Sequence, residues 1–206
     1  YVFRSNMSEV AFKNETDNLT RLYYEDLFVL GEKANNIRKK RFDKKVFFNL
    51  NRHINPTNIC SDVCKFCAFS AHRKNPNPYA LSLEEIVKEA REARDKGAKE
   101  IHIVGAHNPD MGIEFYANVF KAIKSNLPDL HIKALTAAEV DFFARSSGKS
   151  YEDILKIMRD SGVDSMPGGG AEIFEERVRE KICKGKVSSK GWLEIHRLWH
   201  KMGKKS

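Results

Sequence analysis

Three cysteines stand close together in the segment Cys60-Ser61-Asp62-Val63-Cys64-Lys65-Phe66-Cys67. Their spacing is C-x3-C-x2-C, which brings three thiolates near enough to share one inorganic cluster. A [4Fe–4S] cube held by three cysteines keeps one iron without a protein ligand, and that iron can bind a small molecule through an amine and a carboxylate. The spacing therefore predicts a redox iron–sulfur cluster on Cys60, Cys64 and Cys67.

A zinc ion is the alternative occupant of this segment. Structural zinc needs a fourth Cys or His ligand at a suitable distance, and His53 and His72 are the candidates. The remaining cysteine, Cys183, lies alone in a basic stretch, and we expect it to be a bystander. In a reducing compartment, clustering of this kind favours a metal site or catalysis over disulfides.

The elements that must position the cysteines are predicted to alternate between strands and helices. Apolar side chains recur at roughly helical spacing over residues 17–41, and residues 46–50 form a short β-type run. Further strands are expected at 100–105, 130–135 and 163–166. Helices are expected at 83–96, 112–127, 136–146, 151–159, 174–182 and 190–202. Four such alternations indicate an α/β fold with a parallel sheet.

Helix boundaries and turns carry their own signals. Ser82 and Glu85 fit a capping box, and Gly97 is placed to end the helix that they open. Thr136 and Ser150 are placed to begin later helices. Glycine-rich turns follow the second and fourth strands, which places functional loops at the carboxyl edge of the sheet.

The domain organisation follows from these elements. Residues 1–6 precede Met7, which resembles a natural start, and we expect them to be a cloning remnant. Residues 7–50 are expected to form an N-terminal helical extension with a short strand, and residues 51–206 the N-terminal portion of a barrel. Four β/α units cannot close a barrel of about eight strands. We therefore expect that a second half has been removed or that another chain completes the fold.

Composition limits the classes of partner. The formal net charge of +8 favours anionic partners. No stripe of Arg and Lys interleaved with aromatic residues is present, so nucleic acid is not expected as a partner. No apolar run reaches about 18 residues and no signal-peptide layout opens the chain. We expect no membrane span and a cytoplasmic location.

The cysteine motif, with the aromatic Phe66 before its last cysteine, resembles that of the radical S-adenosylmethionine superfamily. The resemblance implies a radical-SAM (β/α) barrel, of which the chain holds the N-terminal four β/α units after a helical segment. It implies a [4Fe–4S] cluster that passes one electron to S-adenosylmethionine, yielding methionine and a 5′-deoxyadenosyl radical. It also implies an electron donor of the flavodoxin or ferredoxin class, and it leaves a homo-oligomer open.

The flanking residues resemble a smaller group of menaquinone and deazaflavin enzymes. Asn51-Arg52-His53 and the stretches 180–187 and 192–196 favour the aminofutalosine synthase family. This implies addition of the radical to 3-[(1-carboxyvinyl)oxy]benzoate, an anionic aromatic substrate, with S-adenosylmethionine consumed as a co-substrate. Dehypoxanthine futalosine cyclase and the deazaflavin-forming synthase subunit stay open as alternatives. So do a metal- or cluster-binding module without catalysis and an inactive fragment.

Further contacts to the cofactor are implied by the resemblance. The family binds the methionine amino group at the end of the second strand, and Phe66 is expected beside the adenine. The expected cofactor-binding residues are Phe66, Gly105, Ala106, His107, Thr136, Gly168, Gly169 and Glu172. For Thr136 and Glu172, capping of the following helix is the competing role.

Contacts to the substrate are implied on the first and third strands. Side chains there alternate, so that every second one points into the barrel. The expected substrate-binding residues are His53, Asn55 and Lys133. For His53 the competing role is a histidine of the core, and for Lys133 a solvated strand lysine.

Overall fold

The computed structural model describes residues 19–71 and 77–206. The expected remnant 1–6 and the zinc candidate His72 lie outside the described residues. The chain divides into two compact units, Tyr1–Phe48 and Asn49–Ser206. Within the described part, the sheet and all buried hydrophobic side chains belong to the second unit.

The first unit contains the short 3-10 helix η1 (Leu22–Tyr24) and the helix α2 (Leu27–Phe42). The single helix predicted over 17–41 is interrupted because Asp26 begins a new one: its carboxylate accepts the backbone N–H groups of Phe28 and Val29. None of the residues of α2 is buried.

The short strand predicted at 46–50 is wrong. These residues have no regular secondary structure, and Val46, Phe47 and Phe48 are largely exposed. The first strand, β1, instead spans Asn51–Ile54, because these are the residues that pair with the second strand. A β-type composition alone does not form a strand without a partner edge.

The sheet contains three parallel strands in the order β1-β2-β3, with β2 at Glu100–Ile103 and β3 at His131–Ala134. The fourth strand predicted at 163–166 is reduced to a single parallel bridge between Ser165 and Lys133. Two N–H groups, of Asp164 and Ser165, share the carbonyl of Ile132, so a regular ladder does not continue. Lys205 in turn forms a parallel bridge with Ser165.

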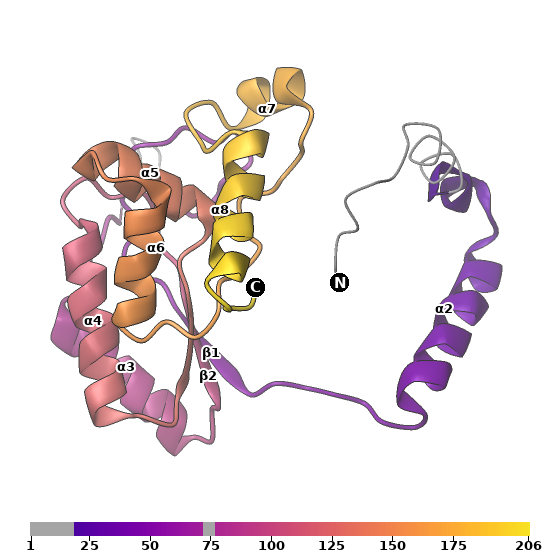
Figure 1. The fold of residues 1–206 in the computed structure, drawn as a ribbon, viewed down its shortest axis with the longest axis horizontal. Helices are drawn as coiled ribbons and strands as arrows, with labels where there is room; N and C mark the ends of the chain where they lie inside the picture. Colours follow the sequence, from indigo (N-terminus) through magenta and orange to yellow (C-terminus); the bar gives the residue numbers. More distant parts are fainter. Residues whose placement is uncertain (1–18, 72–76) are drawn as a thin grey trace. The chain divides into compact units, whose positions relative to one another are not determined.

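The helices of the second unit are α3 (Leu83–Asp95), α4 (Ile113–Asn126), α5 (Ala137–Ser147), α6 (Tyr151–Asp160), α7 (Glu176–Ile182) and α8 (Ser189–Lys201). The predicted capping box of Ser82 and Glu85 is confirmed, and Thr136 and Ser150 begin α5 and α6 with boxes of the same kind. Gly97, at a φ of 93°, follows α3 as predicted. Helix α3 packs on α4, α4 on α6, and α8 on α5 and α6 (Figure 1).

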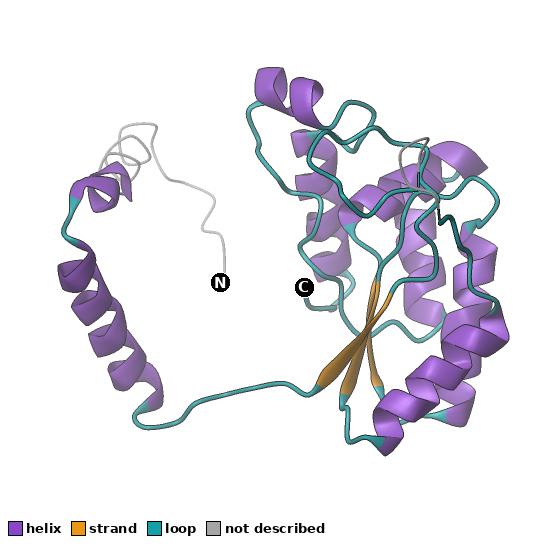
Figure 2. Cartoon of the chain, turned by 180° about the vertical axis from the view of Figure 1, so that it is seen from behind, coloured by secondary structure: helices purple, strands orange, loops and turns teal. Residues whose placement is uncertain are grey.

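The two faces of the sheet differ in polarity. Ile101, Ile103 and Ile132 are fully buried, and α3 packs against β1. The alternate positions carry Asn51, His53, Glu100, His102, His131 and Lys133. The loops that leave the carboxyl ends of the strands gather at the end of the sheet where α7 lies (Figure 2).

None of the helices in the described part of the chain combines the length and the apolar composition that a membrane crossing requires.

Candidate functional site

The cysteine loop leaves β1 through a segment that is tightly bonded to residues farther along the chain. Thr57 Oγ1 donates to the carbonyl of Tyr79 at 2.8 Å and accepts the N–H of Ile59 at 3.1 Å. Asn58 Oδ1 accepts the N–H of Tyr79 at 2.8 Å. Both side chains are buried, so the start of the cysteine loop is fixed before the first cysteine is reached.

The loop itself is bonded to two neighbouring segments. The N–H of Ser61 donates to the carbonyl of His107, after β2, at 3.0 Å. The N–H of Lys65 donates to the carbonyl of Ile182, at the end of α7, at 2.8 Å. These bonds hold the cysteine loop between the carboxyl end of the sheet and α7.

A cavity of about 180 Å³ lies beneath this loop. Eight of the predicted residues line it: Cys60, Cys64, Phe66, Cys67, Gly105, Ala106, His107 and Thr136. The cavity is also lined by Gly170, from the glycine-rich turn predicted after the fourth strand, and by Asp62, Glu139 and Lys186, which the sequence does not single out as site residues. The structure therefore brings the cysteine motif together with the ends of β2 and β3.

All three thiols are free and half-buried. Burial raises the pKa of Cys60, and it raises the pKa of Cys64 to about 11 against the opposing charge of Lys186. Among the described residues, no three Cys, His, Asp or Glu side chains converge on a point that would hold one metal ion. The thiols face a shared space instead. A [4Fe–4S] cluster presents a separate iron to each thiolate, so the donor set fits such a cluster.

His107 connects the cysteine loop to the core. Its ring stacks on Phe142 with centroids 4.8 Å apart, and its Nδ1 lies 2.8 Å from Asp62 Oδ2. Burial would raise the pKa of Asp62, but the contact with His107 and the charges of Arg145 and Lys186 outweigh it and lower this pKa. The cysteine loop therefore carries a negative charge between Cys60 and Cys64, beside the cavity.

Glu139 lines the cavity and bonds to the backbone beside it. Its Oε1 accepts the N–H of Gly105 at 2.8 Å, and its Oε2 accepts the N–H of Thr136 at 2.6 Å and the hydroxyl of Thr136 at 2.9 Å. Burial nevertheless raises the pKa of Glu139. Thr136 thus caps α5, the role that competed with cofactor binding in the sequence. The backbone N–H of Gly105 is already bonded to Glu139.

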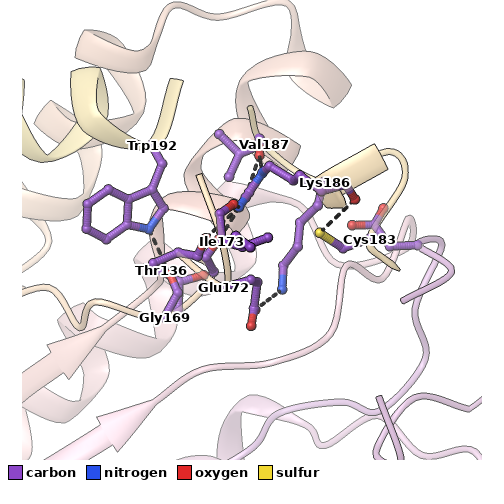
Figure 3. A network of polar contacts seen from close by, with 12 residues as sticks. Thr136, Gly169, Glu172, Ile173, Cys183, Lys186, Val187 and Trp192 are labelled. Carbon is purple, nitrogen blue, oxygen red and sulfur yellow. Dashed lines mark hydrogen bonds and ion pairs between the residues drawn. The ribbon is translucent and has the colours of Figure 1, made fainter. Parts of the chain in front are cut away.

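The glycine segment after the fourth expected strand approaches the cavity at one residue. Gly170, at a φ of 85°, lines it, and a Cβ at this position would lie 3.0 Å from the Cβ of Ala138. Gly168 and Gly169 are not among the lining residues that the structure describes. The carbonyl of Gly169 accepts the indole N–H of Trp192 at 3.1 Å, and Glu172 pairs with Lys186 (Figure 3).

The side chain of Arg179 binds the backbone of the glycine segment. Its guanidinium is buried and donates to the carbonyls of Gly170, Ala171, Ile173 and Val187, at 2.5 to 3.0 Å. A single side chain therefore joins the glycine segment to the residues that follow α7.

The predicted substrate residues lie on the polar face of the sheet, apart from the cavity. His53 stacks on His102 of the next strand with centroids 4.6 Å apart, and Lys133 stands in register with His102. Lys133 Nζ donates to Glu100 Oε1 at 3.0 Å. Asn55, just beyond β1, is half-buried.

The residues that the sequence analysis missed gave weak local signals. Asp62 lies between Cys60 and Cys64, but its position in the sequence does not tell whether its carboxylate faces solvent or the site. Lys186 is one of 36 Lys and Arg residues and lies in a basic stretch, so nothing in its neighbourhood sets it apart. Glu139 is recognisable only as a capping residue. Their roles depend on contacts between distant segments.

Known proteins resemble this chain in sequence. The sequence profile of the Radical SAM superfamily matches residues 54–206. The chain is 38% identical over 187 residues to aminodeoxyfutalosine synthase of Thermus thermophilus, covering 91% of this chain and 50% of that protein. It is 37% identical over 178 residues to 5-amino-6-(D-ribitylamino)uracil–L-tyrosine 4-hydroxyphenyl transferase of Methanopyrus kandleri, covering 86% and 48%. The chain thus spans about half the length of these relatives.

Solved structures show the same fold. Methylornithine synthase aligns with a TM-score of 0.65 at 20% identity, over 96% of this chain and 50% of that one. The hydrogenase maturase HydG aligns with a TM-score of 0.66 at 16% identity, over 87% and 38%. The three-stranded parallel sheet with its helices is part of the barrel of this fold. The superfamily uses a [4Fe–4S] cluster and S-adenosylmethionine, with an electron donor and a small-molecule substrate, and this chain belongs to the radical SAM superfamily.

Proposed function

We propose that this chain forms part of an aminofutalosine synthase, a transferase of menaquinone biosynthesis that acts on 3-[(1-carboxyvinyl)oxy]benzoate. The observation that carries the proposal is the 38% identity to aminodeoxyfutalosine synthase over 91% of the chain, which includes the cysteine loop. The stretch 51–60, which resembles that family, lies within the same match. The enzyme would take electrons from a donor of the flavodoxin or ferredoxin class.

The cavity gives each residue a role in this proposal. Cys60, Cys64 and Cys67 would hold the cluster, since all three thiols face the same space. Phe66 would offer a ring face to the adenine, and Gly105, Ala106 and His107 would contact the methionine end. With cluster and cofactor bound, the site supplies a 5′-deoxyadenosyl radical. Glu139 and Asp62 keep the ends of β2 and the cysteine loop in place around it.

The polar face of the sheet suits an anionic substrate. His53, His102 and Lys133 stand side by side in one register row of the three strands. Lys133 pairs with Glu100, and its side chain is about one third exposed, so its ammonium is accessible to a carboxylate of the substrate. We propose that His53 and Lys133, with Asn55 at the end of β1, bind the carboxylates of the substrate.

A second activity is favoured by a specific observation. Tyrosine 4-hydroxyphenyl transferases of several organisms are 36% to 40% identical to this chain over similar lengths. Such a transferase acts on tyrosine and 5-amino-6-(D-ribitylamino)uracil, as its name states. The same cavity would serve both reactions, because both relatives match across the cysteine loop and differ in their substrates.

A product assay separates the two activities. The chain is reconstituted anaerobically with iron and sulfide, reduced, and supplied with S-adenosylmethionine and one substrate set at a time. We expect aminofutalosine with the enol-ether benzoate and no product with tyrosine and the aminouracil. Lys133→Gln should raise the KM for the benzoate about tenfold with a smaller change in kcat, because a lost charge contact weakens binding. A coupled product from tyrosine and the aminouracil, with no product from the enol-ether benzoate, would replace the first activity by the second.

A further inference from the structure

Lys186 lies on a short segment that the protein fixes at both ends. Before it, the Cys183 thiol donates to the carbonyl of Arg179 at 3.4 Å, and Gly185 has a φ of 91°. After it, the carbonyl of Val187 accepts two bonds from the Arg179 guanidinium. The backbone of Lys186 is therefore held in one position beside the cysteine loop.

The side chain of Lys186 is also held. Its ammonium donates to Glu172 Oε1 at 2.8 Å (Figure 3). The same ammonium lies 5.7 Å from the centre of the Phe66 ring. Only 15% of the side chain is exposed. Burial would lower the pKa of Lys186, but the pairing with Glu172 outweighs it and raises this pKa, so the side chain stays charged.

This charge belongs to the wall of the cysteine cavity. Of the described residues that line the cavity, Lys186 is the one Lys or Arg. The other basic side chain there, His107, is in contact with Asp62. Lys186 therefore places a largely buried positive charge in the same cavity wall as the three cysteine thiols.

We propose that the Lys186 ammonium offsets the negative charge of the three iron-bound thiolates and thereby raises the reduction potential of the cluster, with Glu172 as a counterion that weakens this effect. The inference rests on the cluster assigned to Cys60, Cys64 and Cys67, and it does not depend on which substrate the enzyme takes. One-electron reduction adds a negative charge to the cluster, so a buried cation nearby favours the reduced form. A neighbouring carboxylate acts in the opposite direction.

The test is a redox titration of the reconstituted cluster, without S-adenosylmethionine, followed by the paramagnetic signal of the reduced form. The variants are Lys186→Gln, Lys186→Arg and Glu172→Gln. Lys184→Gln is the matched control, because it removes the same charge two positions away. Lys184 is exposed, so solvent and salt screen its charge. All variants are first checked for folding by circular dichroism.

We expect Lys186→Gln to disfavour reduction by about tenfold or more, which is 59 mV toward more negative potential for one electron. Glu172→Gln is expected to shift the potential in the opposite direction. Lys186→Arg and Lys184→Gln should stay close to the parent. If Lys186→Gln fails to retain a cluster, the positive shift in Glu172→Gln still decides the question.

Three results would overturn the inference. Equal potentials in the parent, Lys186→Gln and Glu172→Gln would show that the charge does not act on the cluster. Weaker binding of S-adenosylmethionine to Lys186→Gln at an unchanged potential would make Lys186 a ligand contact instead. A parent chain that takes up no cluster would refute the cysteine assignment as well, whereas the first two results leave that assignment intact.

Discussion

Burial of the cysteine thiols opposes the charge that they must carry when they bind iron. The pKa of Cys60 and that of Cys64 are both raised by burial. Iron binding has to compensate for this, because the ligand is the thiolate. The site offers Lys186 and a set of oriented backbone groups for the purpose. Cys183 is more deeply buried than the three motif cysteines but does not line the cavity described here.

The first prediction separates ligand cysteines from the bystander. Cys64→Ala should lose most of the iron and sulfide that the parent takes up on anaerobic reconstitution, because a cluster with two protein ligands is poorly held. Cys183→Ala should keep the parent's iron content and lose about 1 kcal/mol of folding free energy from the small cavity it leaves. Iron and sulfide analysis with urea unfolding measures both. Loss of iron in Cys183→Ala at a retained fold would instead make it a ligand.

At the scale of elements, one arginine joins two segments that flank the site. Arg179 in α7 bonds the carbonyls of residues 170, 171, 173 and 187, and its guanidinium has the planar fork that these oxygens require. Lysine has the same charge but cannot reach all of them. The glycine segment and the segment of Lys186 therefore depend on the shape of this side chain.

The second prediction follows from that geometry. Arg179→Lys should lower the free energy of unfolding by about 2 to 4 kcal/mol, since buried carbonyls are left without donors. Arg177→Lys is the matched control, because this side chain is 75% exposed and should change stability by less than about 0.5 kcal/mol. Urea denaturation of both variants measures the difference. Equal stabilities would show that the Arg179 bonds are replaced by water at no cost.

A third prediction concerns α8. The ring of His196 is buried against Trp192, with centroids 4.0 Å apart, and burial, helped by the charge of His200, lowers the pKa of His196 from 6.5 to about 4. Between pH 6.5 and 4, His196 is protonated in the unfolded chain but neutral in the folded chain. The free energy of unfolding therefore decreases as pH falls through this range.

Removing the imidazole tests this. His196→Gln should show a smaller loss of unfolding free energy between pH 6.5 and 4 than the parent, as measured by urea denaturation at a series of pH values. A parallel decline in both proteins would mean that other groups account for the acid sensitivity.

The sequence predicted the helices of the second unit well, because each carries a local signal such as the Ser82–Glu85 box or Gly97. Residues 46–50 do not form the predicted strand, and the predicted fourth strand is reduced to isolated bridges of Ser165 with Lys133 and Lys205, since strands depend on partners elsewhere in the chain. In the cavity, local motifs indicated Phe66 and His107. Lys186 reaches the cavity through contacts between distant segments, which give no local signal, whereas Gly170 belongs to the glycine-rich turn predicted after the fourth strand.

At the scale of the whole molecule, the sheet, the core and the cavity all belong to the unit Asn49–Ser206. This unit contains part of the barrel of its superfamily, including the cysteine loop and the ends of three strands. The groups proposed to bind cluster and cofactor are therefore present together. The residues proposed to bind the substrate lie on the polar face of the sheet, where His53, His102 and Lys133 share one register row.

The most direct test of the central claim is reductive cleavage of S-adenosylmethionine. The anaerobically reconstituted chain is mixed with dithionite and S-adenosylmethionine, with and without the enol-ether benzoate, and methionine, 5′-deoxyadenosine and adenosylated products are measured. We expect methionine release that requires the cluster, is abolished in Cys64→Ala and is retained in Cys183→Ala. A fully loaded cluster without cleavage, or cleavage that persists in Cys64→Ala, would contradict it.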